Sequence, residues 1–130
     1  ITNNKLANLD LSANQKLTQL YCSMNRLTTL NVGTNVLLEE LFCFDNLLST
    51  LDLTKNVTLK QLYCYENMLT SLDLKNGNNS MLTFVNAEQN ENLTCIQVDN
   101  ANSANLGHTP YLLWVVDDIV NYSEDCNYTN

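Results

Sequence analysis

Leucine recurs along the chain at a fixed interval, with polar residues between. Three segments fit the motif LxxLxCxxNxL, each 21 residues after the one before, and they begin at Leu17, Leu38 and Leu59. Related segments with the same 21-residue step lie between them and begin at Leu6, Leu27, Leu48 and Leu69. A fixed period of this length is typical of a solenoid, in which neighbouring units share one continuous core.

Each 21-residue coil contains two half-repeats and therefore two strands. One strand carries Leu-x-Cys, and the other carries Leu-x-Leu or Leu-x-Val. The period is displaced by two residues around positions 77–80 and dissolves in LTCIQVD, which begins at Leu93. We predict a mostly β solenoid of about four coils over residues 1–94, with strands on two faces and a C-terminal cap over residues 95–130, as one structural domain.

Cysteine forms an interior column in the Leu-x-Cys strands. Side chains alternate between the faces of a strand, so Cys22, Cys43 and Cys64 point inward together with the leucines. Free cysteine packs as a small hydrophobic residue, and we expect a reduced structural ladder. A stacked thiolate metal site is the alternative. The chain lacks the CxxC pairs that bring ligands around one ion, and we predict no metal.

Asparagine forms a second column, at the turn after each Leu-x-Cys strand. Its members are Asn25, Asn46, Asn67 and Asn90. A buried amide can donate to and accept from the turn backbone of adjacent coils, and so supplies partners that a tight corner lacks. We expect Asn14, Asn35 and Asn56 to do the same at the opposite corner.

The outward residues differ between the two strand faces. The Leu-x-Leu face presents Asn, Thr, Ser and Asp, which predicts a solvated surface. Asp52 and Asp73 fall in register there and could bridge a cation, although two solvated carboxylates are more often only a negative face.

The Leu-x-Cys face is instead aromatic with an acidic rim. Its outward residues include Tyr21, Phe42, Phe44, Tyr63, Tyr65 and Phe84, with Glu40, Asp45, Glu66 and Glu88. A contiguous apolar patch with a polar rim indicates an interaction site, and we interpret these residues as a ligand-binding face. The alternative is that the stacked aromatic pairs only stabilise the sheet.

The charge and the apolar content of the chain exclude two classes of partner. Fourteen acidic residues against six Lys and Arg give a net charge of -8, which repels phosphate backbones, so we exclude nucleic acid. The apolar run at residues 112–116 ends at Asp117 and Asp118 and is too short to span a bilayer, so we expect no membrane insertion.

The pattern is not that of an enzyme. Glu40, Glu66 and Glu88 line the aromatic face, but a glycosidase needs two carboxyl groups at a set separation and a dry pocket, which a shallow repeat surface rarely supplies. His108 is the only histidine and has no visible nucleophile beside it. We predict no catalytic activity and no cofactor.

The pattern LxxLxCxxNxLxxLDLxxN resembles the short bacterial leucine-rich repeats of the IRREKO type. The tail, LTCIQVD followed by a Trp and then YSEDC, is similar to the ending of secreted leucine-rich-repeat proteins of marine and gut Bacteroidetes. Together the two resemblances cover about Leu6 to Cys126. They imply a leucine-rich-repeat arc, secretion or surface display, and recognition of protein or glycan, and they imply no catalytic residue.

Cys95 and Cys126 lie outside the cysteine column, after the last coil, and we predict that a disulfide between them closes the cap. Such a bond requires an oxidising compartment. Residues 109–122, TPYLLWVVDDIVNY, predict a short amphipathic helix that covers the open core with Leu112, Leu113, Val116, Ile119 and Val120.

These observations predict a secreted or cell-surface recognition module that binds protein or carbohydrate through the aromatic face. The alternative is a structural role. The N-terminal end, where Leu6 opens the first coil, has no cap, and an assembly domain of a larger surface protein could join copies of itself there as a weak homo-oligomer.

Overall fold

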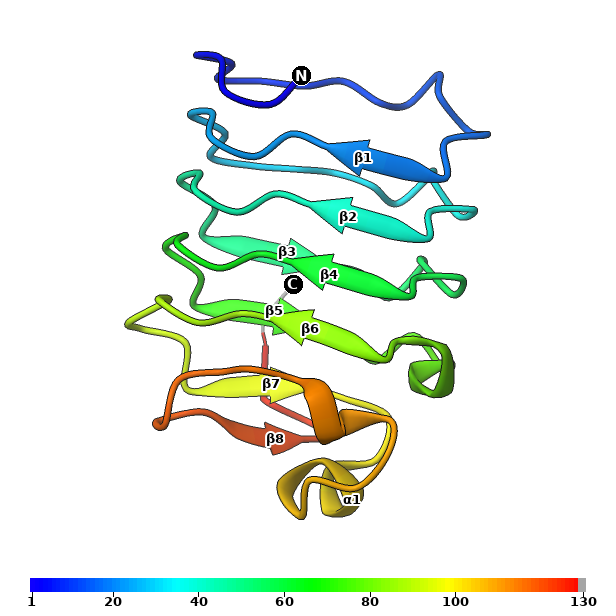
Figure 1. Ribbon diagram of the computed structural model, residues 1–130, viewed down its shortest axis with the longest axis vertical. Helices are drawn as coiled ribbons and strands as arrows, with labels where there is room; N and C mark the ends of the chain where they lie inside the picture. Colours follow the sequence, from blue (N-terminus) through cyan, green and yellow to red (C-terminus); the bar gives the residue numbers. More distant parts are fainter. Residues whose placement is uncertain (129–130) are drawn as a thin grey trace.

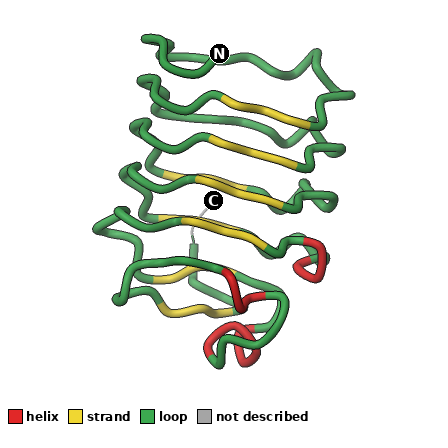
Figure 2. Tube along the Cα trace, viewed as in Figure 1, coloured by secondary structure: helices red, strands yellow, loops and turns green. Residues whose placement is uncertain are grey.

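The computed structural model describes residues 1–128. The chain winds into coils that stack along one axis, with the N-terminal residues at one end and the cap at the other (Figure 1). Most of each coil is loop, and regular structure is confined to short strands and a few helical turns (Figure 2). Strands of three residues suffice because each coil gives the next one a neighbour to pair with.

The strands form two parallel sheets, one on each side of the core (Figure 1). Sheet A, the Leu-x-Cys face, consists of β1 (Gln19–Tyr21), β2 (Glu40–Phe42), β4 (Gln61–Tyr63) and β6 (Phe84–Asn86). Sheet B, on the opposite side, consists of β3 (Thr50–Asp52), β5 (Ser71–Asp73), β7 (Cys95–Gln97) and β8 (Asn121–Ser123). The predicted β solenoid with strands on two faces is confirmed.

The leucine period sets the register of sheet A. Leu41 pairs with Leu20 on one side and with Leu62 on the other, one period away in each direction. The next partner of Leu62 is Val85, two residues later than the period predicts. The extra residues lie in the turn that contains the 3-10 helix η1 (Asn79–Met81), so the core row continues without a break.

Asn25, Asn46, Asn67 and Asn90 are buried at the corner after each sheet A strand, and Asn67 shows how this column works. Its Nδ2 donates to the carbonyl of Cys64 at 3.1 Å in its own coil and to that of Cys43 at 3.0 Å in the coil before. Its Oδ1 accepts the backbone N–H of Leu48 at 3.0 Å. One buried side chain therefore satisfies three backbone groups and joins two coils.

The opposite corner follows the same plan less completely. Asn35 and Asn56 are buried, and each donates to two carbonyls of the preceding coil. Within residues 1–128 their Oδ1 atoms have no hydrogen-bond partner. Asn14 is exposed, so the prediction that it fills this corner is wrong. It lies in the first coil, and its carbonyl oxygen instead accepts from Asn35.

The cap contains a short helix, but not where the sequence predicted it. α1 spans Ala101–Asn105, in the polar segment before the apolar one. The only helix within residues 109–122 is the 3-10 helix η2 (Tyr111–Leu113), which is followed by the extended residues Trp114 and Val115, a turn between Asp117 and Val120, and the start of β8. Leu112 and Leu113 are 66% and 60% exposed and Ile119 is also exposed, so these three do not cover the core as expected.

Backbone pairing explains this difference. β6 is the last strand of sheet A, and its outer edge needs partners. The N–H of Val115 donates to the carbonyl of Val85 at 2.7 Å, and its carbonyl accepts from Ala87 at 2.9 Å. The buried Trp114 donates its indole N–H to the carbonyl of Leu82 at 2.8 Å. An extended segment satisfies these groups. In a helix the backbone N–H and C=O groups would hydrogen-bond within the segment and could not pair with β6.

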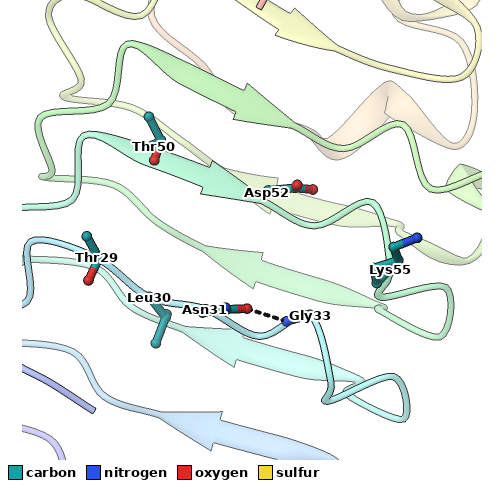
Figure 3. Close-up of a pocket in the computed structure, with 7 residues that line it drawn as sticks. All are labelled: Thr29, Leu30, Asn31, Gly33, Thr50, Asp52 and Lys55. Atoms are coloured by element: carbon teal, nitrogen blue, oxygen red, sulfur yellow. Dashed lines mark hydrogen bonds between the residues drawn. The ribbon is translucent and has the colours of Figure 1, made fainter. Parts of the chain in front are cut away.

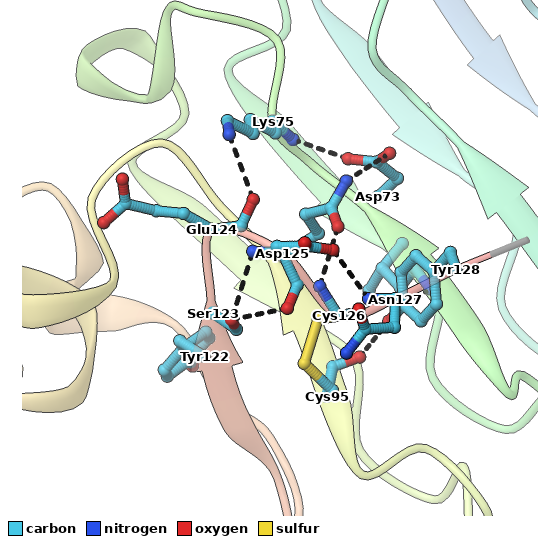
Figure 4. Close-up of a disulfide and its surroundings, with 12 residues drawn as sticks. Asp73, Lys75, Cys95, Tyr122, Ser123, Glu124, Asp125, Cys126, Asn127 and Tyr128 are labelled. Carbon is cyan, nitrogen blue, oxygen red and sulfur yellow. Dashed lines mark hydrogen bonds between the residues drawn. A yellow bond between two sulfur atoms is a disulfide. The ribbon is translucent and has the colours of Figure 1, made fainter.

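The predicted disulfide between Cys95 and Cys126 is present, with the two Cα atoms 5.9 Å apart. It holds the C-terminal tail against sheet B (Figure 4). Beyond it, the hydroxyl of Tyr128 donates to the carbonyl of Cys95 in β7 and accepts the N–H of Leu72 in β5 at 3.2 Å. This hydroxyl therefore bridges the two strands at the start of their pairing.

The division at residue 94 stays a prediction. β7 begins at Cys95, on the cap side of that division, and pairs in parallel with β5. β8 in turn pairs with β7, so the cap continues sheet B rather than forming a separate layer.

The asparagine column can be tested by unfolding. We expect Asn67→Ala to lower the free energy of unfolding by about 2 to 4 kcal/mol, because it leaves a buried N–H and two carbonyls without their partner. The measurement is urea denaturation followed by circular dichroism. Asn92→Ala, at an exposed asparagine, is the control. An equal decrease in the free energy of unfolding in both variants would contradict a stabilising role of the asparagine column.

The disulfide can be tested in the same way. We expect Cys95→Ala with Cys126→Ala to cost about 3 to 4 kcal/mol, the loop-closure estimate for a separation of 31 residues. Thermal unfolding of the wild type with and without a reductant gives an independent measure. A midpoint that does not move under either change would show that the tail is held by its hydrogen bonds alone.

Candidate binding face

The aromatic residues predicted for the Leu-x-Cys face lie together on the outer side of sheet A. Tyr21, Phe42, Tyr63 and Phe84 occupy four successive coils, and adjacent ring centroids are 4.6, 4.3 and 5.0 Å apart. Phe44 and Tyr65 form a second stack beside the first, with centroids 4.5 Å apart. Parallel pairing in register produces this alignment, because equivalent residues of neighbouring coils lie one strand spacing apart.

In two of the ring pairs the rings cover one another's faces, and in the other two they are tilted, at 39° and 45°. Phe42 and Tyr63 are nearly parallel, at 8°, and so are Phe44 and Tyr65, at 5°. Tyr21 is 40% exposed and the other aromatic residues of this face are half-buried. The surface therefore offers solvent mainly ring edges, with free ring faces only where a stack ends.

Acidic side chains border the stacks. Glu40 accepts a hydrogen bond from the hydroxyl of Tyr21 at 2.6 Å, and this bond raises the pKa of Tyr21. Asp45 and Glu66 occupy the corner positions of adjacent coils, both with left-handed backbone. Burial, followed by the charge of Glu66, raises the pKa of Tyr65. The field on this face is therefore negative.

Ser23 occupies, one coil earlier, the position equivalent to Phe44, Tyr65 and Glu88, but its side chain is buried. The N-terminal residues fold over it, and the N–H of Asn3 donates to its carbonyl at 2.9 Å. The Phe44–Tyr65 stack thus has a covered end and an open one, and the open end faces the coil of Glu88.

Sheet B has a different surface. A slot of about 310 Å³ opens between residues 29–33 and β3, lined by polar side chains that include Asn31, Asp52 and Lys55 (Figure 3). Within residues 1–128 no backbone hydrogen bond joins residues 28–31 to β3, so the coils part there. The polar groups serve their own turns: Asp52 accepts from the N–H and hydroxyl of Thr54, and Asn31 accepts from the N–H of Gly33.

The aspartate pair of sheet B is in register, as the sequence indicates. Asp52 and Asp73 are paired positions of β3 and β5. Burial raises the pKa of Asp73, and Gln97 donates to its carboxylate at 2.9 Å. Among the described residues no group of three or more His, Cys, Asp or Glu could hold a metal ion. Within the described chain the pair is therefore not joined by a third side chain of these types.

The cysteines of the interior column are free and buried. Burial raises the pKa of Cys22 to about 11 and that of Cys64 to about 12, and the pKa of Cys43 also lies well above its ordinary value. A thiol in this state is protonated at neutral pH and is a poor nucleophile. These cysteines are packing residues, as the sequence indicates.

The cap has an apolar surface that the sequence did not predict. Leu106, Leu112, Leu113 and Ile119 are exposed on the cap, where the predicted helix would have turned the last three inward. No helix among residues 1–128 has the length and apolar character needed to cross a membrane.

Comparison with solved structures identifies a similar fold. The functional domain of InlJ from Listeria monocytogenes, which includes a cysteine ladder, superposes on this chain with a TM-score of 0.60 at 30% sequence identity. The match covers 73% of this chain and 23% of that chain, so this chain spans about a quarter of its neighbour's length. No family model matches the chain, and no curated protein does.

With this neighbour, the repeat and the two sheets, the fold is that of a leucine-rich-repeat solenoid with a disulfide-linked cap. The neighbour also carries a cysteine ladder, as Cys22, Cys43 and Cys64 form here. The resemblances to the IRREKO type and to proteins of Bacteroidetes stay predictions.

The thiols of the ladder give a test of its burial. At pH 8 we expect iodoacetamide to leave all three cysteines unlabelled in the native protein and to label them fully in concentrated guanidinium. Because the folded pKa of Cys22 is raised from 9.0 to about 11, its contribution to stability is complete below pH 9 and is lost as the pH rises toward 11. Mass spectrometry of the labelled protein is the measurement. Native labelling at pH 8 would contradict a closed core.

Proposed function

We propose that this chain is a secreted or cell-surface recognition module that binds its ligand through the aromatic face of sheet A. One observation carries the proposal: six aromatic side chains are gathered on one side of a rigid sheet, with acidic residues at their border. Single apolar side chains on a surface need no explanation, but a contiguous group of them does.

The contrast between the two sheets supports this choice of face. Polar side chains of sheet B are engaged with their own turns, as Asp52 is with Thr54. The outer side of sheet A carries large rings with little rotamer entropy to lose on binding. Aromatic stacking also stabilises the sheet, by a few tenths to about 1 kcal/mol for each pair. Stacking does not require the acidic border, whereas recognition of a partner gives it a use.

Protein is the ligand class that the ring geometry favours over carbohydrate. A sugar ring packs best on a free aromatic face, and stacking leaves few of these, since Phe42 and Tyr63 cover each other. Ring edges and carboxylates suit the mixed surface of a protein. The leucine-rich-repeat fold is consistent with a protein-interaction module.

The disulfide supports the proposed location, because such bonds persist in oxidising compartments. The shallow, open form of the aromatic face supports a binding role rather than catalysis, since Glu40, Glu66 and Glu88 lie along a sheet surface and not in a closed pocket.

Two double variants test the proposal, one on the aromatic face and one on the cap. We expect Tyr63→Ala with Tyr65→Ala to reduce binding at least about tenfold to whichever components of an array of secreted proteins and glycans the wild type captures, because central aromatic residues dominate interface energies. Leu112→Ala with Leu113→Ala, which removes exposed apolar area from the cap, should leave binding unchanged.

Both variants should first be shown by circular dichroism to keep the wild-type fold, because Tyr63 and Tyr65 are half-buried and each stacked pair contributes a few tenths to about 1 kcal/mol. Equal binding by the wild type and both variants would contradict the proposal that the ligand binds through the aromatic face. Loss only in the cap variant would move the site to the cap.

A further inference from the structure

The second aromatic stack of sheet A ends at Tyr65. Phe44 covers one face of Tyr65, with the two planes at 5°. In the first row Tyr63 is followed by the ring of Phe84, tilted by 45° at a centroid distance of 5.0 Å. In the second row the next coil carries Glu88 where a ring would continue the stack. One face of Tyr65 is thus left without an aromatic partner, beside a carboxylate.

Two more carboxylates surround this ring. Glu66 follows Tyr65 in the chain, and its N–H donates to the carbonyl of Glu88 at 3.1 Å, which holds the two glutamates on adjacent coils. The N–H of Asp45 donates to the carbonyl of Tyr65 at 3.0 Å, so this aspartate borders it from the preceding coil. Glu88 is half-buried, and Asp45 and Glu66 are exposed.

The outward rows that run through the strands of sheet A and on to Met24, Asp45, Glu66 and Gln89 contain no Lys or Arg. The exposed Arg26 and Lys60 lie beside these rows, Arg26 after the corner that follows β1 and Lys60 before β4. Within residues 1–128 the structure has one salt bridge, between Lys60 and Glu39 at 3.2 Å, and it involves none of the three acids around Tyr65. These carboxylates therefore have no internal counter-ion.

We propose that the aromatic face binds a cationic protein segment, and that an arginine of this partner lies against the free face of Tyr65 and pairs with Glu66 and Glu88. The inference rests on the proposed function and names the chemistry of its ligand.

Physical chemistry favours a guanidinium at this position. The face of an aromatic ring carries negative quadrupole charge and attracts a cation placed over it, arginine more often than lysine. The planar guanidinium can stack on the ring and still direct N–H groups to carboxylates at its edge. Burial, and after it the charges of Glu66 and Asp45, raise the pKa of Tyr65, and the same charges would stabilise a cation beside the ring. The methylene groups of the arginine would pack on the ring edges.

Net charge alone would also attract cationic probes, because the whole chain carries -8. A useful experiment must therefore separate a local site from diffuse attraction. Two carboxylates elsewhere provide the match: Glu91 and Asp118 are exposed, and their side chains form no hydrogen bond within the described chain. Glu91→Gln with Asp118→Asn changes the net charge by as much as Glu66→Gln with Glu88→Gln.

The first probe is an acetylated, amidated hexa-arginine peptide, titrated by calorimetry. The salt concentration is about 0.15 M, at which the Debye length is about 8 Å and distant charges are screened. We expect Glu66→Gln with Glu88→Gln to weaken binding by about fivefold or more, as two partly exposed ion pairs would, and the charge-matched control to change it less than about twofold. Equal weakening in both variants, or none in either, overturns the arginine site.

The second probe is an unbiased peptide library displayed on phage and selected on the wild-type chain. Peptides that lose binding to Tyr63→Ala with Tyr65→Ala should be rich in arginine. If the selected peptides depend on the two tyrosines but lack basic residues, the face binds protein and the cationic inference fails. If no selected peptide depends on the tyrosines, the proposed function fails.

Discussion

The buried amide at each corner is what makes the rest of this solenoid possible. A coil of 21 residues must turn sharply, and its corner places backbone N–H and C=O groups where neither water nor a strand can reach them. Asn46 and Asn67 satisfy those groups and connect each coil to the one before it. The side chain thereby fixes the spacing and the register of neighbouring coils together, and the leucine rows follow from that register.

The aromatic stacks are a consequence of the same register. When coil follows coil without slippage, Phe42 lies 4.3 Å from Tyr63, and equivalent ring positions become neighbours whether or not a ligand requires them. Stacking and recognition therefore do not exclude each other, because stacked rings form a rigid surface that loses little entropy on binding. Stabilisation of the sheet and recognition of a ligand can be told apart at the end of a stack, where a ring face has no aromatic neighbour.

The periodic parts of the protein could be predicted from the sequence, and the parts where the period fails could not. Cys43, Asn67 and Leu62 each repeat in register, so their burial follows from alternation and spacing alone. The disulfide followed from the position of its two cysteines outside the column. The cap helix was misplaced because apolar spacing around Leu112 does not reveal that the edge of β6 needs a backbone partner, which Val115 supplies. The slot beside β3 was missed for a similar reason, since it depends on hydrogen bonds that are not formed.

The two sheets differ in where their pairing begins, and this difference bears on function. Sheet A is paired from β1 onward, whereas sheet B begins at β3, and the preceding coil stands apart from it. A surface whose strands are joined over its whole length holds its side chains at fixed separations, while the parted coils beside β3 do not. Recognition that depends on a ring and two carboxylates at set positions requires the first kind of surface. The position of Tyr65 on β4's coil, with a paired strand on each side, meets that requirement.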